Sequence, residues 1–324
     1  MGKYILRRII GIIPLLFGIS LLSFAVINLA PGKPVALENS LNPRISAQTL
    51  LRLQKLYELD KPLHERYWNW LKRAVVFDFG RSFGDNRPVM DKIAERLPIT
   101  VTINLLSLLL ILAAAIPLGM RCALRPDGAL DKSVTAAMFF IFAVPTFWLA
   151  LLLMNFFGIT LRWLPVSGIT SLDYEYLSPA GKAADLFRHL LLPVTVSSLG
   201  GIAAMARYMR SSMIDALAQP YIRMARAKGL TEGSVLYKHA FRNAVMPLVT
   251  ILGLSIPGLV GGSVIFESIF SIPGAGRLFY EAVMMRDYPL IMAEVVIVSL
   301  LTMSANLLAD LSYAWIDPRL RDKR

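Results

Sequence analysis

Long stretches without a charged residue alternate with short charged segments along this chain. Four stretches exceed 20 uncharged residues, and two shorter or interrupted ones follow the same pattern. They are residues 9–30, 99–120, 133–161 and 243–266, then 190–206 with 17 uncharged residues and 288–309 with Glu294 inside it. A helix of about 20 apolar residues crosses the roughly 30 Å hydrocarbon layer of a bilayer. The pattern therefore predicts an all-α membrane protein with six transmembrane helices.

The lengths of three stretches refine this prediction. Residues 133–161 are too many for one crossing, so we expect the tail near 158–161 to lie at the membrane interface. Residues 190–206 are few for a crossing, so this helix is either short or continues past Arg207. The first stretch has 22 residues, which exceeds the hydrophobic region of about 7–15 residues in a secretory signal peptide. We therefore expect an uncleaved first helix.

Composition and charge agree with a membrane protein and give it an orientation. Hydrophobic residues make up 56% of the chain and charged residues 17%, against about a quarter charged in soluble domains. The formal charge of +12 could indicate nucleic-acid binding. However, 17 Lys and Arg lie in segments that an inward N-terminus places in the cytoplasm, against 5 in the two short outer loops. This bias predicts that both termini are cytoplasmic, with lipid rather than nucleic acid as the partner.

Three segments divide the chain: a first transmembrane helix over 1–30, an extracytoplasmic segment over 31–98, and a five-helix core over 99–324. The long outer segment between helices 1 and 2 should be structured, because leucines follow helical spacing over residues 46–59. Aromatic and basic side chains then alternate between residues 67 and 83. This composition fits either a small domain packed on the membrane surface or a docking surface for an extracytoplasmic partner.

The inner loop between the fourth and fifth helices, about 207–246, is long, basic and helix-prone. Pro220 suits the first position of a helix and Gly229 the position just after its end, which predicts a helix over 220–228. A second helical stretch should follow over 234–243, before the fifth transmembrane helix. A basic amphipathic helix often lies at the membrane interface. Small residues here also allow another backbone to approach closely.

The motifs of common enzymes are missing from the sequence. No G-x-x-x-x-G-K-[ST] phosphate loop occurs, so we expect no ATP binding of the P-loop type. No H-E-x-x-H or G-x-S-x-G motif occurs either. The single cysteine, Cys122, permits no internal disulfide and receives no function. We therefore expect neither catalytic residues nor a metal site, and no cofactor in this chain.

Polar groups inside the last two apolar stretches are candidates for a translocation path. Glu294 lies within residues 288–309, Glu267 near the outer end of the fifth helix, and Asn306 one turn before Asp310. A charge at the bilayer centre costs about 2.5–3.5 kcal/mol on insertion scales, so such residues usually face protein or water. The alternative is that they hold helices together by hydrogen bonds.

Specific motifs add a family resemblance. Residues 221–230 read Tyr-Ile-Arg-Met-Ala-Arg-Ala-Lys-Gly-Leu, and residues 239–244 read His-Ala-Phe-Arg-Asn-Ala. Together they resemble the coupling segment of binding-protein-dependent ABC importer permeases, in the variant of the dipeptide/oligopeptide/nickel family. Weaker matches in the same order lie at 3–8, 78–83, 87–89, 163–165, 273–277, 286–289 and 317–319.

One departure from the general permease motif narrows the resemblance. That motif begins Glu-Ala-Ala and has Gly four residues after the second Ala, whereas Arg223 and Met224 stand at the first two positions here. Ala225 and Gly229 match. The departure is similar to the peptide/nickel branch, and it removes any role that needs a carboxylate at position 223.

The resemblance implies a peptide permease in the bacterial cytoplasmic (inner) membrane. It implies a heterodimer with a homologous sister permease, two ABC ATPase subunits that bind ATP and Mg, and an extracytoplasmic solute-binding protein that segment 31–98 helps to receive. The residues that would dock on an ATPase are Tyr221, Arg223, Ala225, Arg226, Ala227, Gly229 and Leu230. The same machinery could import nickel or another small solute, and a stand-alone channel or secondary transporter is a further alternative. The sequence does not determine the solute.

Overall fold

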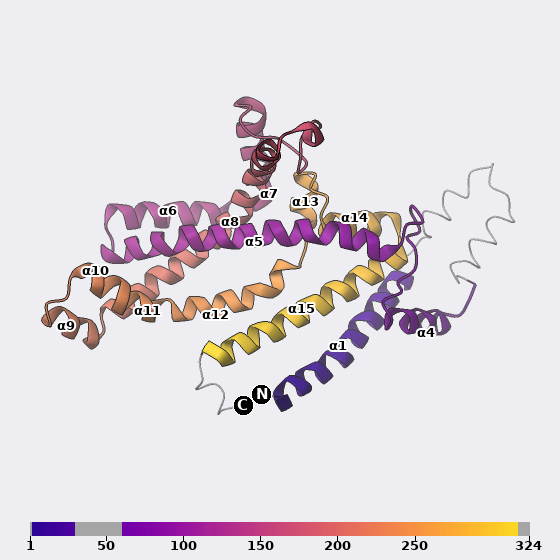
Figure 1. The fold of residues 1–324 in the computed structure, drawn as a ribbon, viewed down its shortest axis with the longest axis horizontal. Helices are drawn as coiled ribbons and strands as arrows, with labels where there is room; N and C mark the ends of the chain where they lie inside the picture. The colour runs from indigo at the N-terminus through magenta and orange to yellow at the C-terminus, as the bar shows by residue number, and fades with distance from the viewer. Residues whose placement is uncertain (1, 30–59, 317–324) are drawn as a thin grey trace. The chain divides into compact units, whose positions relative to one another are not determined.

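The computed structural model describes residues 2–29 and 60–316, which form helices and one isolated bridge between Arg81 and Pro88 (Figure 1). The chain divides into two compact units, and the division runs through one long helix between Thr100 and Val101. Unit 1 contains residues 1–100, 260–267 and 273–308. Unit 2 contains residues 101–259, 268–272 and 309–324.

Unit 1 contains all or part of three long helices. Its elements are α1 (Gly2–Leu29), α4 (Leu63–Ala74), the first part of α5 (Val89–Leu124), most of α13 (Val264–Ile269), α14 (Ala275–Met285) and most of α15 (Tyr288–Ile316). Apolar side chains of the 78–89 segment, α14 and α15 form its buried core, with Phe79, Val89 and Leu290 among the most buried. Ile27 of α1 packs against the same cluster.

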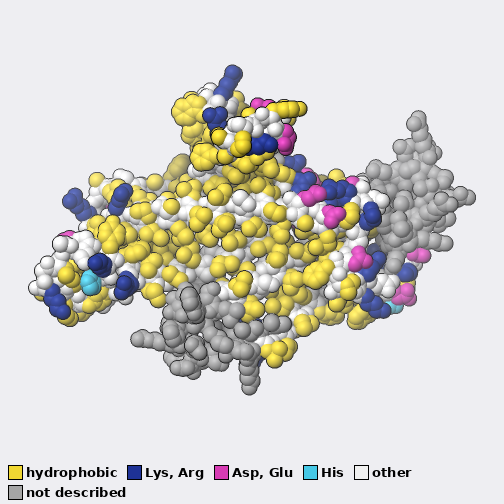
Figure 2. Space-filling view, viewed as in Figure 1, with side chains coloured by type: hydrophobic (Ala, Val, Ile, Leu, Met, Phe, Trp, Pro, Cys, Tyr) yellow, Lys and Arg dark blue, Asp and Glu magenta, His cyan; other side chains and the backbone are white. Residues whose placement is uncertain are grey.

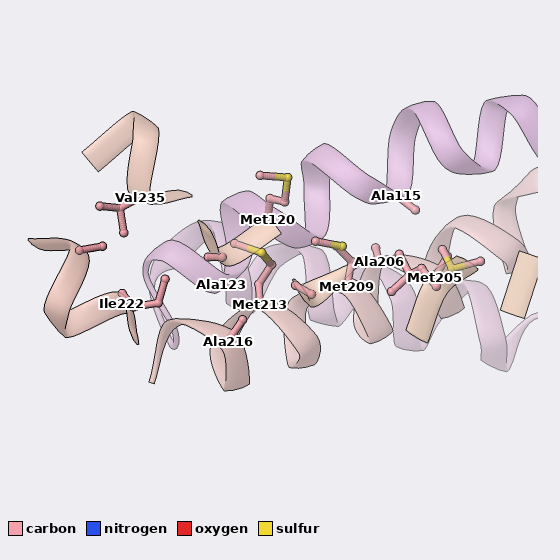
Figure 3. Close-up of a cluster of buried hydrophobic side chains, with 14 residues drawn as sticks. Ala115, Met120, Ala123, Met205, Ala206, Met209, Met213, Ala216, Ile222 and Val235 are labelled. Atoms are coloured by element: carbon pink, nitrogen blue, oxygen red, sulfur yellow. The ribbon is translucent and has the colours of Figure 1, made fainter. Parts of the chain in front are cut away.

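Unit 2 carries the remaining helices. They are α6 (Ala129–Ala143), α7 (Thr146–Leu153), η2 (Met154–Thr160), η3 (Tyr174–Tyr176), α8 (Pro179–Leu217), α9 (Pro220–Ala227), α10 (Glu232–Ser234), η4 (Val235–Ala240), α11 (Phe241–Ala244), α12 (Met246–Ser255) and η5 (Ile256–Leu259). Its core lies between α5, α8 and the α9–α12 region (Figure 3). Glycine permits the close packing of α5 on α8: a Cβ at Gly119 would lie 2.5 Å from the Ala206 carbonyl oxygen.

The transmembrane prediction is confirmed in its helical character. Among the described residues, four helices are long and apolar enough to cross a membrane: Leu6–Leu29, Val89–Leu124, Pro179–Leu217 and Tyr288–Asp310. Two bent pairs, Ala129–Ala143 with Thr146–Thr160 and Glu232–Ala244 with Met246–Leu259, bring the number to six if each pair is one span. The structure is consistent with an all-α membrane permease, while the cytoplasmic placement of both termini stays a prediction.

The third apolar stretch breaks at a proline. Its two halves meet at an angle of 103°, and Val144 between them has an extended backbone with φ −94° and ψ 129°. A proline disfavours the helical conformation of the residue before it, and Pro145 then starts the second helix. Residues 133–161 therefore belong to two helices joined by a bend at Val144 and do not form one straight helix. The sequence analysis did not locate this bend.

Helix boundaries differ from the boundaries of the apolar stretches. α5 begins at Val89, well before residue 99, because a helix continues beyond the hydrocarbon layer even where charged residues begin. α8 extends to Leu217, which confirms that the fourth helix continues past Arg207. The helix expected over 46–59 lies outside the described residues, whereas α4 is an additional helix within the aromatic stretch.

Candidate functional site

The short helix α9 is held to unit 2 by one face. Pro220 occupies its first turn, where the missing N–H costs no hydrogen bond. Ile222 is fully buried and Ala225 is 6% exposed, and both belong to the core cluster that also contains Val235 of η4 (Figure 3). Tyr221 packs partly against this cluster. The spacing of Ile222 and Ala225 places both on one side of the helix.

A Schellman motif closes the end of α9. The Leu230 N–H donates to the Ala225 carbonyl oxygen at 3.4 Å, and the Gly229 N–H donates to that of Arg226 at 2.9 Å. These are the two hydrogen bonds that define the motif, with Gly229 as the left-handed residue. Its φ of +79° lies in the left-handed region, and its place just after the helix agrees with the predicted position of Gly229. The helix itself ends at Ala227, one residue before the predicted end.

The chain leaves α9 in a second stabilised turn. The Arg226 guanidinium contacts both carboxylate oxygens of Glu232, at 2.9 and 3.2 Å. The Thr231 hydroxyl accepts from the Ser234 N–H and caps the next helix. The helical stretch then runs from Glu232 to Ala244 and meets α12 at an angle of 46°. The predicted second helix over 234–243 is therefore present, and Pro247 lies in the first turn of α12.

The other face of α9 is open to solvent. Met224 is 57% exposed and Leu230 40%, and Arg223 and Ala227 are also exposed. Basic side chains gather over the α9–α11 end of unit 2 in Figure 2. Among the predicted docking residues, Ala225 alone is buried, because it packs in the chain's own core and is not on the open face. Met224, which the prediction omitted, is instead a prominent apolar side chain of the open face.

Glu267, a candidate for the translocation path, is hydrogen-bonded within unit 1. It is 5% exposed. Its carboxylate accepts from the Thr100 hydroxyl at 2.9 Å and from the Arg277 N–H at 2.8 Å. Thr100 in turn accepts from the Ala275 N–H at 2.9 Å. Two of the unpaired N–H groups at the start of α14 are thus satisfied, so Glu267 fixes this helix end, and its part in a translocation path stays a prediction.

Glu294 and Asn306 lie on different sides of α15. Glu294 is 3% exposed, and its Oε2 has no hydrogen-bond partner among the described residues. Asn306 is exposed. Twelve residues of a helix at 3.6 per turn rotate a side chain by about a third of a turn beyond whole turns, so the two do not share a face. The path assignment of both residues also stays a prediction.

One buried ion pair was not found by sequence reasoning. Asp131 at the start of α6 is 3% exposed, and both of its carboxylate oxygens accept from the Arg210 guanidinium of α8 at 2.6 Å. The bidentate geometry fixes α6 against α8. The two residues are 79 positions apart, and nothing in a single sequence indicates that they pair.

The described residues contain no group of three or more His, Cys, Asp or Glu side chains that could hold a metal ion. Cys122 is a buried free thiol beside the Asp131–Arg210 region. Two features of the described residues are candidates for function. One is α9 in unit 2, which ends in a Schellman motif and exposes one face. The other is the network of buried hydrogen bonds around Glu267 in unit 1.

Comparison with known proteins agrees with this architecture. The family model described as "Binding-protein-dependent transport system inner membrane component" matches residues 115–322, and the corresponding N-terminal model matches residues 1–104. An oligopeptide transport system permease protein, AppB of Bacillus subtilis, is 41% identical over 321 residues, covering 99% of each chain. The glutathione transport system permease protein GsiC of Escherichia coli K12 is 37% identical over 324 residues, covering 100% of each chain.

A third relative, the probable peptide ABC transporter permease protein y4tP of Sinorhizobium fredii, is 35% identical over 321 residues, with 99% of this chain and 100% of the relative covered. Matches of this length include every described helix. The chain therefore belongs to the family of binding-protein-dependent transport system inner membrane components, as a multi-pass permease of the peptide type in the bacterial inner membrane.

Proposed function

We propose that this chain carries peptides across the membrane and that partner ATPases dock on the open face of α9. The relatives are named for oligopeptide, peptide and glutathione transport, and glutathione is itself a small peptide, which supports peptides as the solute class. One observation carries the docking proposal: α9 exposes one face to solvent, while a Schellman motif fixes its C-terminal end.

The construction of α9 suits the transmission of force. Buried Ile222 and Ala225 tie the helix to the core, and the Schellman motif fixes the direction in which the chain leaves it. Only Ala218 and Gln219 separate α9 from α8, a continuous helix of 39 residues. A push or pull on α9 therefore reaches the membrane region through α8, and the Asp131–Arg210 ion pair passes it on to α6.

The remaining partners follow from the same proposal. ATP and Mg would be bound by two ATPase subunits, since this chain has no P-loop motif. A homologous sister permease would complete the transmembrane pathway, and a solute-binding protein would deliver the peptide at the opposite membrane face. The segment 31–98 would help to receive that protein.

Charge introduction on the open face of α9 tests this proposal. We expect Met224→Lys to lower ATPase co-purification and ATP-driven peptide uptake by about tenfold or more, because burying a Met side chain contributes about 1.5–3 kcal/mol. The matched control is Leu172→Lys, which changes an exposed apolar residue (106% relative exposure) in the predicted outer loop between α7 and α8. Normal co-purification and uptake in the Met224 variant would contradict docking on α9.

A further inference from the structure

A pocket lined by three arginines lies in unit 1, at the end of α1 and the start of α15, and contains no residue of α9. Its volume is about 260 Å³. Three sets of residues line it: Phe24, Ile27 and Asn28 at the end of α1; Arg66, Trp70 and Arg73 on α4 with the 78–86 segment; and Tyr288, Pro289 and Met292 at the start of α15. Because the candidate membrane span of α1 ends there and that of α15 begins there, we expect the pocket to lie at the level of the membrane interface.

The pocket is lined by both basic and apolar side chains. Arg66, Arg73 and Arg81 line it together with a single acid, Asp78. The Asp78 carboxylate accepts from the Gly80 N–H at 3.1 Å, and Arg81 donates to the Asn86 carbonyl oxygen at 2.8 Å. Arg66 lies 5.9 Å from the centre of the Phe24 ring. Three guanidinium groups and one carboxylate therefore line the pocket, and guanidinium groups bind phosphate oxygens with directional hydrogen bonds.

The surroundings indicate what kind of anion fits. Val26 and Leu29, in the last two turns of α1, are 59% and 77% exposed, and a hydrocarbon chain can cover such side chains beside the pocket. Drug-sized ligands occupy pockets of about 300–1,000 Å³, so this pocket admits a headgroup and leaves acyl chains outside. α4 carries Trp68 and Trp70, residue types typical of membrane interfaces.

We infer that this pocket binds the phosphodiester headgroup of an anionic phospholipid, with the acyl chains lying along α1. The arginines that line the pocket supply the charge complementarity, and the apolar end of α1 supplies the surface for the chains. A lipid in this position would hold α1 and α4 against the start of α15. The inference does not depend on ATPase docking, and its test measures lipid rather than transport.

Native mass spectrometry of the purified full chain tests the inference. The detergent-solubilised protein is supplied with phosphatidylglycerol or, separately, with zwitterionic phosphatidylcholine. We expect phosphatidylglycerol to be retained preferentially, and Arg73→Gln to reduce its retention by about fivefold, since each basic residue near an anionic lipid surface contributes a factor of this size. Lys72→Gln is the matched control, because it removes the same charge from the neighbouring position of α4, which does not line the pocket.

Three outcomes would overturn the lipid site. They are equal retention of both lipids, equal losses in the Arg73 and Lys72 variants, and displacement of the bound lipid by millimolar inorganic phosphate, which would identify a soluble anion as the ligand. Loss of binding only when an acidic binding protein is added would point to a protein partner in place of lipid. A thermal shift of the full chain by phosphatidylglycerol that Arg73→Gln abolishes, and Lys72→Gln does not, would support the site independently.

Discussion

Two glycine-dependent regions, α9 and the α13–α14 corner (residues 262–277), use glycine for opposite reasons. In the corner, space requires it: a Cβ at Gly274 would lie 2.4–2.6 Å from the Glu267 carboxyl atoms, and one at Gly262 would lie 2.1 Å from the Gly276 nitrogen. At the end of α9, a Cβ on Gly229 meets nothing within 4 Å, and only its φ of +79° favours glycine.

This difference separates a part of the molecule that maintains the fold from a part that presents a surface. The buried Glu267 carboxylate of the corner is hydrogen-bonded inside unit 1, to the Thr100 hydroxyl and to the start of α14. α9 buries only one face and leaves the other to contact something else. We therefore expect a substitution in the corner to lower the yield of folded subunit. A substitution at Gly229 should leave that yield normal and lower only the transport activity.

The largest effect should come from Gly274→Ala. The added methyl group would overlap the buried Glu267 carboxylate, and overpacking of this kind costs about 1–3 kcal/mol. We expect a clear loss of folded subunit in size-exclusion chromatography and a lower melting temperature. Gly233→Ala is the control, because a Cβ there meets nothing within 4 Å. Equal yields of both variants would show that the corner tolerates displacement of Glu267.

Gly229→Val should leave the subunit level normal and remove ATP-coupled uptake. A residue with a Cβ in the left-handed conformation costs about 1–2 kcal/mol, a factor of about five to thirty in an equilibrium, and β-branching increases the cost. Gly229→Asn should retain more uptake, because Asn enters this conformation more easily. Uptake and stimulated ATPase activity in the valine variant within about twofold of wild type would refute the coupling assignment.

Glu294→Leu should separate the path role from a structural role in α15. The Oε2 atom of Glu294 has no partner among the described residues, so removing the carboxylate loses no hydrogen bond there and should leave insertion and complex yield unchanged. We expect uptake to fall severalfold. A fall in complex yield instead would identify Glu294 as a contact between helices. Normal uptake and normal yield together would remove it from the candidate site.

The smallest effect is expected for Glu232→Gln. Arg226 and Glu232 side chains are 47% and 74% exposed, and exposed ion pairs contribute about 0–1 kcal/mol. ATP-driven uptake should therefore stay within about threefold of wild type at physiological salt, in the same assay as the Gly229 variants. A loss as large as that of Gly229→Val would mean that this ion pair, and not the glycine, sets the direction of the chain after α9.

The sequence by itself determined the membrane character, the helical class and the position of the short helix α9. Uncharged stretches long enough to cross a bilayer are a local property, and the Pro220 and Gly229 signals act within a few residues of one helix. These features depend on neighbours along the chain, so one sequence is enough to read them. The family motifs placed the same segment independently of the helix signals.

Only the tertiary structure decided which side chains are buried or hydrogen-bonded inside the chain and which stay exposed for contacts with other molecules. Ala225 and Ala227 look equivalent in the sequence, but packing against Val235 and the core buries the first and leaves the second exposed. Glu267 looks like a charge in a membrane helix until Thr100 and the start of α14 are brought to it from 167 and 10 residues away. Asp131 and Arg210 likewise pair only after α6 folds against α8. Such contacts join residues that are distant in sequence, because packing and buried hydrogen bonds select partners by position in space.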